Sequence, residues 1–375
     1  MIYLDCNSTT QMELEVRDAM LRFMNEEYGN EGSRTHSFGV RAKQAVQKAR
    51  ELVGKVVAVG RDEVIFTSGA TEGNNIAILG LAKWGLQNGR NHIVSTQIEH
   101  KAVLEPLEKL QKEGFEVDLV APDKDGWVDP VKIQKALRPE TLLLAMMHAN
   151  NETGVIQPLP EVIELLKKHP AYLFVDAAQT FGKLDGGLSN PRVDMLSASA
   201  HKIYGPKGIG VLIARRRGFD PVPLAPLMVG GGQERGLRPG TLPVHLIVGF
   251  GKAAELAIRD QKKRLNLCAV FREKFLKNIE PLAPSFQGDP AKSLIHTANV
   301  SFPGVNSEAA MVALKEIVAV SNGSACTSAS YNPSHVLKAM GLAEDQILGA
   351  IRFSWSHLTS DPDWNSIRVS LSALQ

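Results

Sequence analysis

The chain has 375 residues, a length that predicts about two domains rather than one ordinary core. Hydrophobic residues make up 44% and charged residues 22%, which is the composition of a globular protein. A net charge of +2 gives no reason to expect nucleic acid as the main ligand, and no apolar stretch approaches the roughly 20 residues of a transmembrane helix.

Helical and strand patterns alternate along the first two thirds of the chain. The predicted helices are Ser37–Val57, Thr71–Leu86, Ala102–Glu113 and Leu159–His169. The predicted strands are Glu63–Thr67, His92–Ser95, Phe115–Val120, Leu142–Met147, Tyr172–Val175, Met195–Ser199 and Gly210–Ala214. This alternation predicts an α/β fold with a parallel or mostly parallel sheet, and ligands at the carboxyl ends of its strands.

A second, smaller domain is expected after a long helical region that runs from about Val244 to Ile279. Charge concentrates within that region at 260–264, so we place the boundary close by. Residues 1–257 are expected to form a large domain. Its first dozen residues are expected to pack on the small domain. Residues 258–375 are expected to form a small α+β domain, with strands near His296–Phe302 and Ile317–Ser321.

The three cysteines, Cys6, Cys268 and Cys326, are too few and too scattered for a disulfide framework. The sequence contains no CxxC pair of the kind that binds structural zinc, so no metal is expected. The start of the chain lacks the pattern of a signal peptide, so a reducing cytoplasm is predicted. Cys268 lies at helical spacing from Leu265 and Phe271, which predicts a core position.

Residues 67–72 join a predicted strand to a predicted helix through small side chains. A helix N-terminus offers free N–H groups and the positive end of a dipole, so the segment fits a phosphate-sized anion. The alternative is a simple N-cap formed by Ser68 or Thr71, which for an isolated segment is the commoner case.

Lys202 lies at the end of another predicted strand, just before a glycine-containing turn. A partly desolvated lysine amine can form a Schiff base with an aldehyde cofactor. The alternatives are an ordinary surface lysine, or Lys207 in the same role, although its glycine-rich flanks favour a turn.

Asp176 and His100 also follow predicted strands. A buried Asp176 needs a charged partner such as a protonated pyridinium nitrogen; the alternative is a cap of the next helix. His100 is placed to stack on a flat cofactor and to transfer protons, although a lone histidine is more often structural.

Cys326 lies among Gly, Ser and Ala residues, whereas a structural cysteine prefers apolar neighbours. This setting predicts an exposed and mobile loop, which a thiolate nucleophile needs in order to visit a second site.

Taken in this order, the segments resemble those of the cysteine desulfurases, pyridoxal 5'-phosphate enzymes of the class V aminotransferase group. The resemblance extends from Tyr3 to Ser354 and includes the motifs SGATE, IEHKAVL, HANNETG, VDAAQ, SAHKIYGPKGIG, GGGQERGLRPGT and GSACTSAS. It implies the fold type I of pyridoxal-phosphate-dependent transferases, with a seven-stranded sheet in the large domain, and a homodimer. The last motif resembles the NifS- and IscS-like subgroup, which supplies sulfur to iron–sulfur cluster assembly and other pathways.

The resemblance also implies the site residues and their roles. Lys202, Cys326 and His100 are expected to be catalytic, with Cys326 carrying the persulfide to acceptor proteins. Arg352, assisted by Asn151, is expected to bind the carboxylate of L-cysteine through its guanidinium fork. The expected cofactor-binding residues are Ala70, Thr71, His100, Asn151, Asp176, Gln179, Ser199, His201, Lys202 and, from the other subunit, Thr241.

Several positions depart from the pattern of the family. Many relatives have alanine at Ser8 and proline at Gln11, a proline is usual at Glu31, and Pro239 replaces a small residue. The chain also ends at Gln375, without the longer tail of some relatives. These departures leave the sulfur acceptor open among an iron–sulfur scaffold, a sulfur carrier and a partner in DNA phosphorothioation.

Two other functions fit parts of the same sequence. Another class V enzyme, an aminotransferase or a cysteine or selenocysteine lyase, keeps Lys202 and Asp176 but has no use for Cys326. A non-catalytic regulatory or scaffold protein on the same fold needs none of the three. A dedicated nucleic-acid binder needs a clustered basic face, and only short runs such as 215–217 are present.

Overall fold

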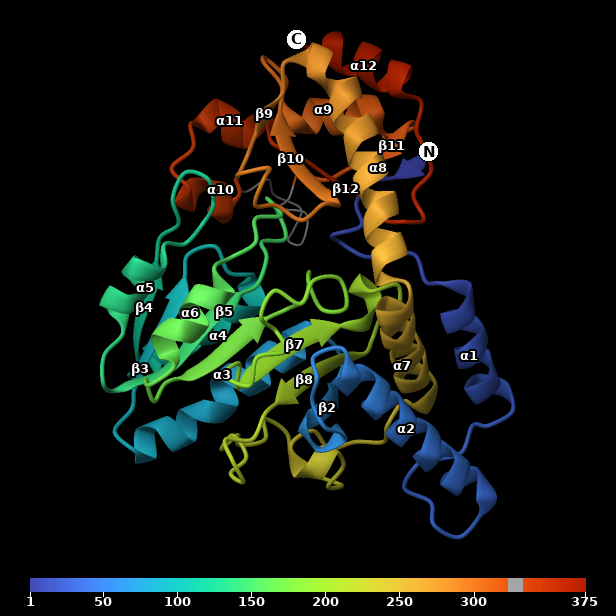
Figure 1. Cartoon of the computed structure of the whole chain (residues 1–375), viewed down its shortest axis with the longest axis vertical. Helices are drawn as coiled ribbons and strands as arrows, with labels where there is room; N and C mark the ends of the chain where they lie inside the picture. Colours follow the sequence, from blue (N-terminus) through green and yellow to red (C-terminus); the bar gives the residue numbers. More distant parts are fainter. Residues whose placement is uncertain (323–332) are drawn as a thin grey trace.

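A seven-stranded sheet lies at the centre of the computed structural model, which describes residues 1–322 and 333–375 (Figure 1). The strand order is β2-β8-β7-β6-β5-β3-β4. β8 runs antiparallel to both neighbours and every other pair is parallel, which confirms the predicted mostly parallel sheet. The strands are β2 (Val64–Thr67), β3 (His92–Thr96), β4 (Glu116–Val120), β5 (Thr141–Met147), β6 (Tyr172–Asp176), β7 (Met195–Ser199) and β8 (Gly210–Ala214).

Two separate groups of buried apolar side chains cover the two faces of this sheet. In β2, Val64 and Phe66 belong to one group and Ile65 to the other, because successive side chains of a strand point to opposite faces. The first group includes side chains of α2 (Ser37–Lys55), α5 (Pro130–Ala136), α6 (Leu159–Leu166) and α7 (Val244–Arg259). The second includes side chains of α3 (Ala70–Gln87) and α4 (Lys101–Lys112).

A three-stranded antiparallel sheet, in the order β12-β10-β9, has an apolar group of its own. Phe275 of α8 packs on Phe353 and Trp355, with ring centroids 5.1 and 5.4 Å away. Cys268 is 5% exposed in the same group, which confirms its predicted core position. The elements here are α8 (Gln261–Ile279), β9 (Ser285–Phe286), β10 (Thr297–Ser301), α9 (Ser307–Leu314), β11 (Val318–Ala319), α10 (His335–Ala339), α11 (Glu344–Gly349), β12 (Ile351–Ser354) and α12 (Trp364–Ser372).

The start of the chain joins this second group rather than the large sheet. β1 (Ile2–Tyr3) pairs with β11 in parallel, and Leu4 is fully buried among the apolar side chains around α8. The chain then leads through α1 (Leu14–Asn25), which packs along α7 (Figure 1). The division into residues 1–257 and 258–375 stays a prediction, as does the cytoplasmic location.

Short 3-10 helices connect several of these elements, and the long helical region breaks at Asp260 into α7 and α8. They are η1 (Arg61–Glu63), η2 (Ala200–Lys202), η3 (Glu234–Gly236) and η4 (Glu280–Leu282). In the described part of the chain, no helix combines the length and the apolar character that crossing a membrane requires.

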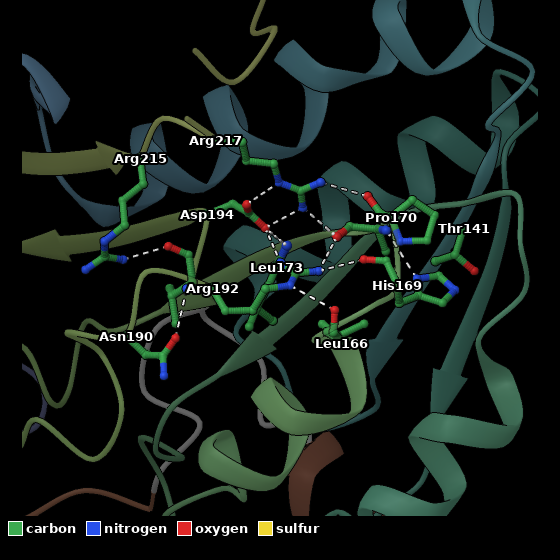
Figure 2. Close-up of polar contacts among 12 residues, drawn as sticks. Thr141, Leu166, His169, Pro170, Leu173, Asn190, Arg192, Asp194, Arg215 and Arg217 are labelled. Carbon is green, nitrogen blue, oxygen red and sulfur yellow. Dashed lines mark hydrogen bonds and ion pairs between the residues drawn. The ribbon is translucent and has the colours of Figure 1, made fainter. Parts of the chain in front are cut away.

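A buried carboxylate ties three segments together at the amino-terminal edge of the sheet (Figure 2). Asp194 directly precedes β7, and its side chain is 2% exposed. Its oxygens accept hydrogen bonds from the backbone N–H of Leu173 (2.7 Å), from Arg192 (2.6 Å) and from Arg217 (2.6 Å). Arg192 also donates to the carbonyls of Leu166, His169 and Ala171, so this cluster fixes the loop that leads into β6.

Replacing Asp194 with alanine is expected to lower the free energy of unfolding by about 3 kcal/mol, because two arginines lose their carboxylate in a largely buried place. Urea denaturation measures this loss. Glu116→Ala is the matched control, since Glu116 forms an ion pair with Arg138 at which both side chains are exposed (62% and 38%). That variant should lose less than about 1 kcal/mol. Equal losses of stability in the two variants would contradict the stabilising role of the buried Asp194 cluster.

Candidate active site

A cavity of about 220 Å³ lies at the carboxyl-terminal edge of the large sheet. Its lining residues come from the sheet edge, from the start of α3, from β12 and from the first residues of the chain. They are Asn7, Ser8, Ala70, Thr71, Asn74, His100, Ala102, Met147, Ala149, Asn151, Asp176, Ala178, Gln179, Ser199, His201, Lys202 and Arg352.

One described residue that was predicted for the site does not line this cavity. Thr241 is exposed and does not line it, so its expected role in a second subunit stays a prediction. Cys326 lies outside the described residues. Every other residue that the sequence singled out for the site lines the cavity.

One wall of the cavity is the N-terminus of α3. The backbone N–H of Ala70 donates to Oγ of Ser199, 2.7 Å away at the end of β7. Gly210 of β8 permits this approach, because a Cβ at that position would lie 2.5 Å from Cα of Gly69. The first turn of an 18-residue helix therefore directs its N–H groups and the positive end of its dipole to this wall, which fits an anionic group.

Asp176 ends β6 and lines the same cavity, and both of its oxygens are hydrogen-bonded. Oδ2 accepts from the Asn74 amide at 2.8 Å, and Oδ1 accepts from the backbone N–H of Ala178 at 2.9 Å. The Asn74 side chain is in turn held by the hydroxyl of Ser197. Asn74 therefore sets the orientation of the carboxylate, and the sequence did not indicate it.

Lys202 and Gln179 both contact the backbone of the first residues of the chain. Nζ of Lys202 donates to the carbonyl oxygens of Asn7 and Ser8, the latter at 2.9 Å. Nε2 of Gln179 donates to the same Asn7 carbonyl at 3.1 Å. Oε1 of Gln179 is buried and accepts no hydrogen bond from any described residue.

Two histidines lie at the edges of the cavity. His100 caps α4, and its Nδ1 accepts the backbone N–H of Ala102 at 3.0 Å, which places the proton of a neutral ring on Nε2. Nδ1 of His201 lies 3.1 Å from the hydroxyl of Thr9. Burial and then the neighbouring charge of Lys202 lower the pKa of His201 to about 4, so its ring is neutral at pH 7.

Arg352 reaches the cavity from β12, and its side chain is only 4% exposed. Nη2 donates to Oδ1 of Asp5 at 2.6 Å and to Oγ of Ser8 at 2.8 Å. Nη1 donates to the carbonyl of Asn151 at 3.0 Å. These three hydrogen bonds fix the position of the guanidinium, and the Arg352 side chain lines the cavity.

Glu99 is fully buried next to His100. Oε1 accepts from the hydroxyl of Thr96 at 2.7 Å and from the backbone N–H of Met147 at 2.8 Å. Burial, which outweighs these hydrogen bonds, raises the pKa of Glu99 to about 8. The carboxyl is therefore protonated at neutral pH in the folded protein, while in the unfolded chain it is ionised.

Because the folded protein keeps a proton that the unfolded chain loses above pH 4.5, Glu99 makes the protein less stable as pH rises from about 4.5 to about 8. Glu99→Gln keeps the side chain neutral. We expect the free energy of unfolding of wild type to fall relative to this variant by on the order of 2 kcal/mol between pH 5 and pH 8. Urea denaturation at the two pH values tests this, with the exposed Glu113→Gln as control. Parallel pH profiles for wild type and Glu99→Gln would disprove it.

The chain is similar in sequence to known proteins over most of its length. The profile of the family described as aminotransferase class-V matches residues 2–364. Cysteine desulfurase IscS of Anaeromyxobacter dehalogenans (strain 2CP-C) is 43% identical over 364 residues, which cover 96% of this chain and 89% of the relative.

Two solved structures are similar over nearly the whole length. A NifS-like protein superposes with a TM-score of 0.90 and 36% identity, covering 100% of this chain and 98% of the other. The crystal structure of DndA from Streptomyces lividans superposes with a TM-score of 0.83 and 46% identity, covering 96% of this chain and 100% of the other.

Proposed function

The chain belongs to the aminotransferase class-V family, and from this premise we propose that it is a cysteine desulfurase. It converts L-cysteine to L-alanine and transfers the sulfur to Cys326 as a persulfide. The observation that carries the proposal is the cavity that brings together an amine, a carboxylate and a guanidinium, on Lys202, Asp176 and Arg352.

The family implies the use of pyridoxal 5'-phosphate, and the residues of the cavity fit that group. The N-terminus of α3 suits its phosphate, the carboxylate of Asp176 suits its ring nitrogen, and the buried Oε1 of Gln179, which has no partner among the described residues, suits a polar substituent. When bound, the cofactor supplies an aldehyde that reacts with amines and a ring that accepts electrons from the substrate.

The phosphate would be held by the start of α3 and by residues near the end of β7. These are Ala70, Thr71, Ser199 and His201, joined by Thr241 of a second subunit in the expected homodimer. His100 would stack on the ring, and Lys202 would hold the aldehyde carbon covalently through Nζ.

The remaining roles concern the amino acid itself. Arg352 pairs with the carboxylate of cysteine, assisted by Asn151. Lys202 would take the α-proton of the substrate, for which a partly buried amine is suited. His100 is within the same cavity and serves proton transfer.

The other two cysteines are poor candidates for the sulfur carrier. Cys6 and Cys268 are 4% and 5% exposed, and burial raises the pKa of both thiols, that of Cys268 to about 11. Both therefore stay protonated at neutral pH, and the thiol form is a weak nucleophile. This leaves Cys326 as the cysteine that suits sulfur transfer.

The decisive test replaces Cys326 with serine, which removes the thiol but adds no bulk. The purified protein is mixed with L-cysteine, and alanine and protein-bound persulfide are measured together. We expect the variant to bind cysteine yet to lose at least about 100-fold in alanine formation, because a hydroxyl is a far weaker nucleophile toward sulfur.

Unchanged alanine formation by Cys326→Ser would instead favour another class V enzyme, such as a lyase. A wild type that binds the cofactor without any turnover would favour a regulatory or scaffold protein. Cys268→Ser is the matched control and should keep both products. The homodimer, the cytoplasmic location and a sulfur acceptor are further parts of this proposal. Sedimentation measures the oligomeric state, and copurification identifies the acceptor.

A further inference from the structure

The guanidinium of Arg352 has few N–H groups left for a ligand. Nη2 has two N–H groups, and it makes two hydrogen bonds, to Asp5 and to Ser8. Nη1 donates one of its two to the carbonyl of Asn151. Nε is buried and has no partner in the part of the chain that the structure describes.

A carboxylate can grip a guanidinium with both oxygens in two ways, through Nη1 and Nη2 or through Nε and Nη2. Both ways use an N–H of Nη2. Since Asp5 and Ser8 occupy both of these N–H groups, a carboxylate that binds Arg352 with two oxygens must displace one of them.

Geometry and charge identify Ser8 as the group that leaves. Ser8 lines the cavity together with Arg352, whereas Asp5 does not. Asp5 accepts from Nη2 at 2.6 Å and forms an ion pair with the guanidinium, whereas Ser8 accepts at 2.8 Å through a neutral hydroxyl and adds no opposite charge. The half-buried Ser8 hydroxyl can turn to water once it is released.

We propose that Ser8 is a positioning residue that occupies Arg352 in the free enzyme and gives way to the substrate carboxylate. This inference rests on the proposed role of Arg352 in binding that carboxylate. Ser8 competes with the substrate, so it weakens substrate binding and holds the guanidinium in place while the site is free. Alanine at this position would remove the hydroxyl and keep the backbone hydrogen bonds of Ser8 with Lys202 and Asp5.

The test measures binding of 3-mercaptopropionate, a thiol carboxylate without an amino group, to the cofactor-loaded protein by calorimetry. Ser8→Ala leaves an N–H of Arg352 without its protein partner in the free enzyme, so we expect the probe to bind about three- to tenfold more tightly. Ser8→Thr restores the hydroxyl and should return the affinity to that of wild type. In steady-state kinetics, Ser8→Ala should lower KM for L-cysteine more than it changes kcat.

Weaker or unchanged binding of the probe by Ser8→Ala would overturn the proposal, because it would mean that the hydroxyl supports the bound carboxylate or ignores it. Arg352→Gln separates this failure from a failure of the proposed function. If that variant binds the probe as wild type does, the carboxylate site itself is wrong. If it loses binding while Ser8→Ala is unchanged, only the competing role of Ser8 is wrong. Thermal unfolding of each variant checks that the fold is kept.

Discussion

The hydrogen bonds of one short segment near the start of the chain hold the site together. The Asn7 carbonyl accepts from Lys202 and Gln179 on the large sheet. The Asn7 side chain donates to the hydroxyl of Thr297 and to the carbonyl of Asn151, each at 3.1 Å. Asn7 is 1% exposed, so these bonds are shielded from water and hold strands of both sheets at fixed positions.

The ionisable side chains at and near the cavity differ in the groups that they contact. The two carboxylate oxygens of Asp176 accept hydrogen bonds from neutral donors, the amide of Asn74 and the backbone N–H of Ala178. Oε2 of Glu99 is buried and has no hydrogen-bond partner among the described residues, and burial raises the pKa of this carboxyl to about 8, so it stays protonated at neutral pH. Arg352 is instead neutralised by Asp5, which permits a guanidinium to stay buried before a ligand arrives.

Elements with a clear local pattern could be predicted closely from the sequence. The predicted strands Met195–Ser199 and Gly210–Ala214 have the observed bounds of β7 and β8, and the helix predicted at Ser37–Val57 ends two residues earlier, at Lys55. β12 was not predicted as a strand, because Ile351–Ser354 shows no turn signal and is recognised as a strand only through its pairing with β10. α1 was likewise missed, since several of its apolar side chains (Leu14, Leu21 and Met24) are exposed and do not mark one buried face.

The same limit applies to the site. Asp176, which ends β6, and Lys202, which lies in the 3-10 helix directly after β7, could be identified because a strand end is a local pattern. Asn7, Ser8 and Asn74 could not, because their roles depend on partners far along the chain: Asn74 bonds to Asp176, 102 residues away, and Arg352 lies 344 residues from Ser8. Only the family pattern pointed to Arg352, and no pattern pointed to what surrounds it.

The pairing of the two ends of the chain has a consequence for biosynthesis. The backbone N–H of Ser354 donates to the Leu4 carbonyl, and that of Cys6 donates to the Ser354 carbonyl, so these two bonds form only after position 354 has left the ribosome. Pairing between residues so far apart closes a loop of nearly the whole chain, and contacts of this kind form slowly during folding.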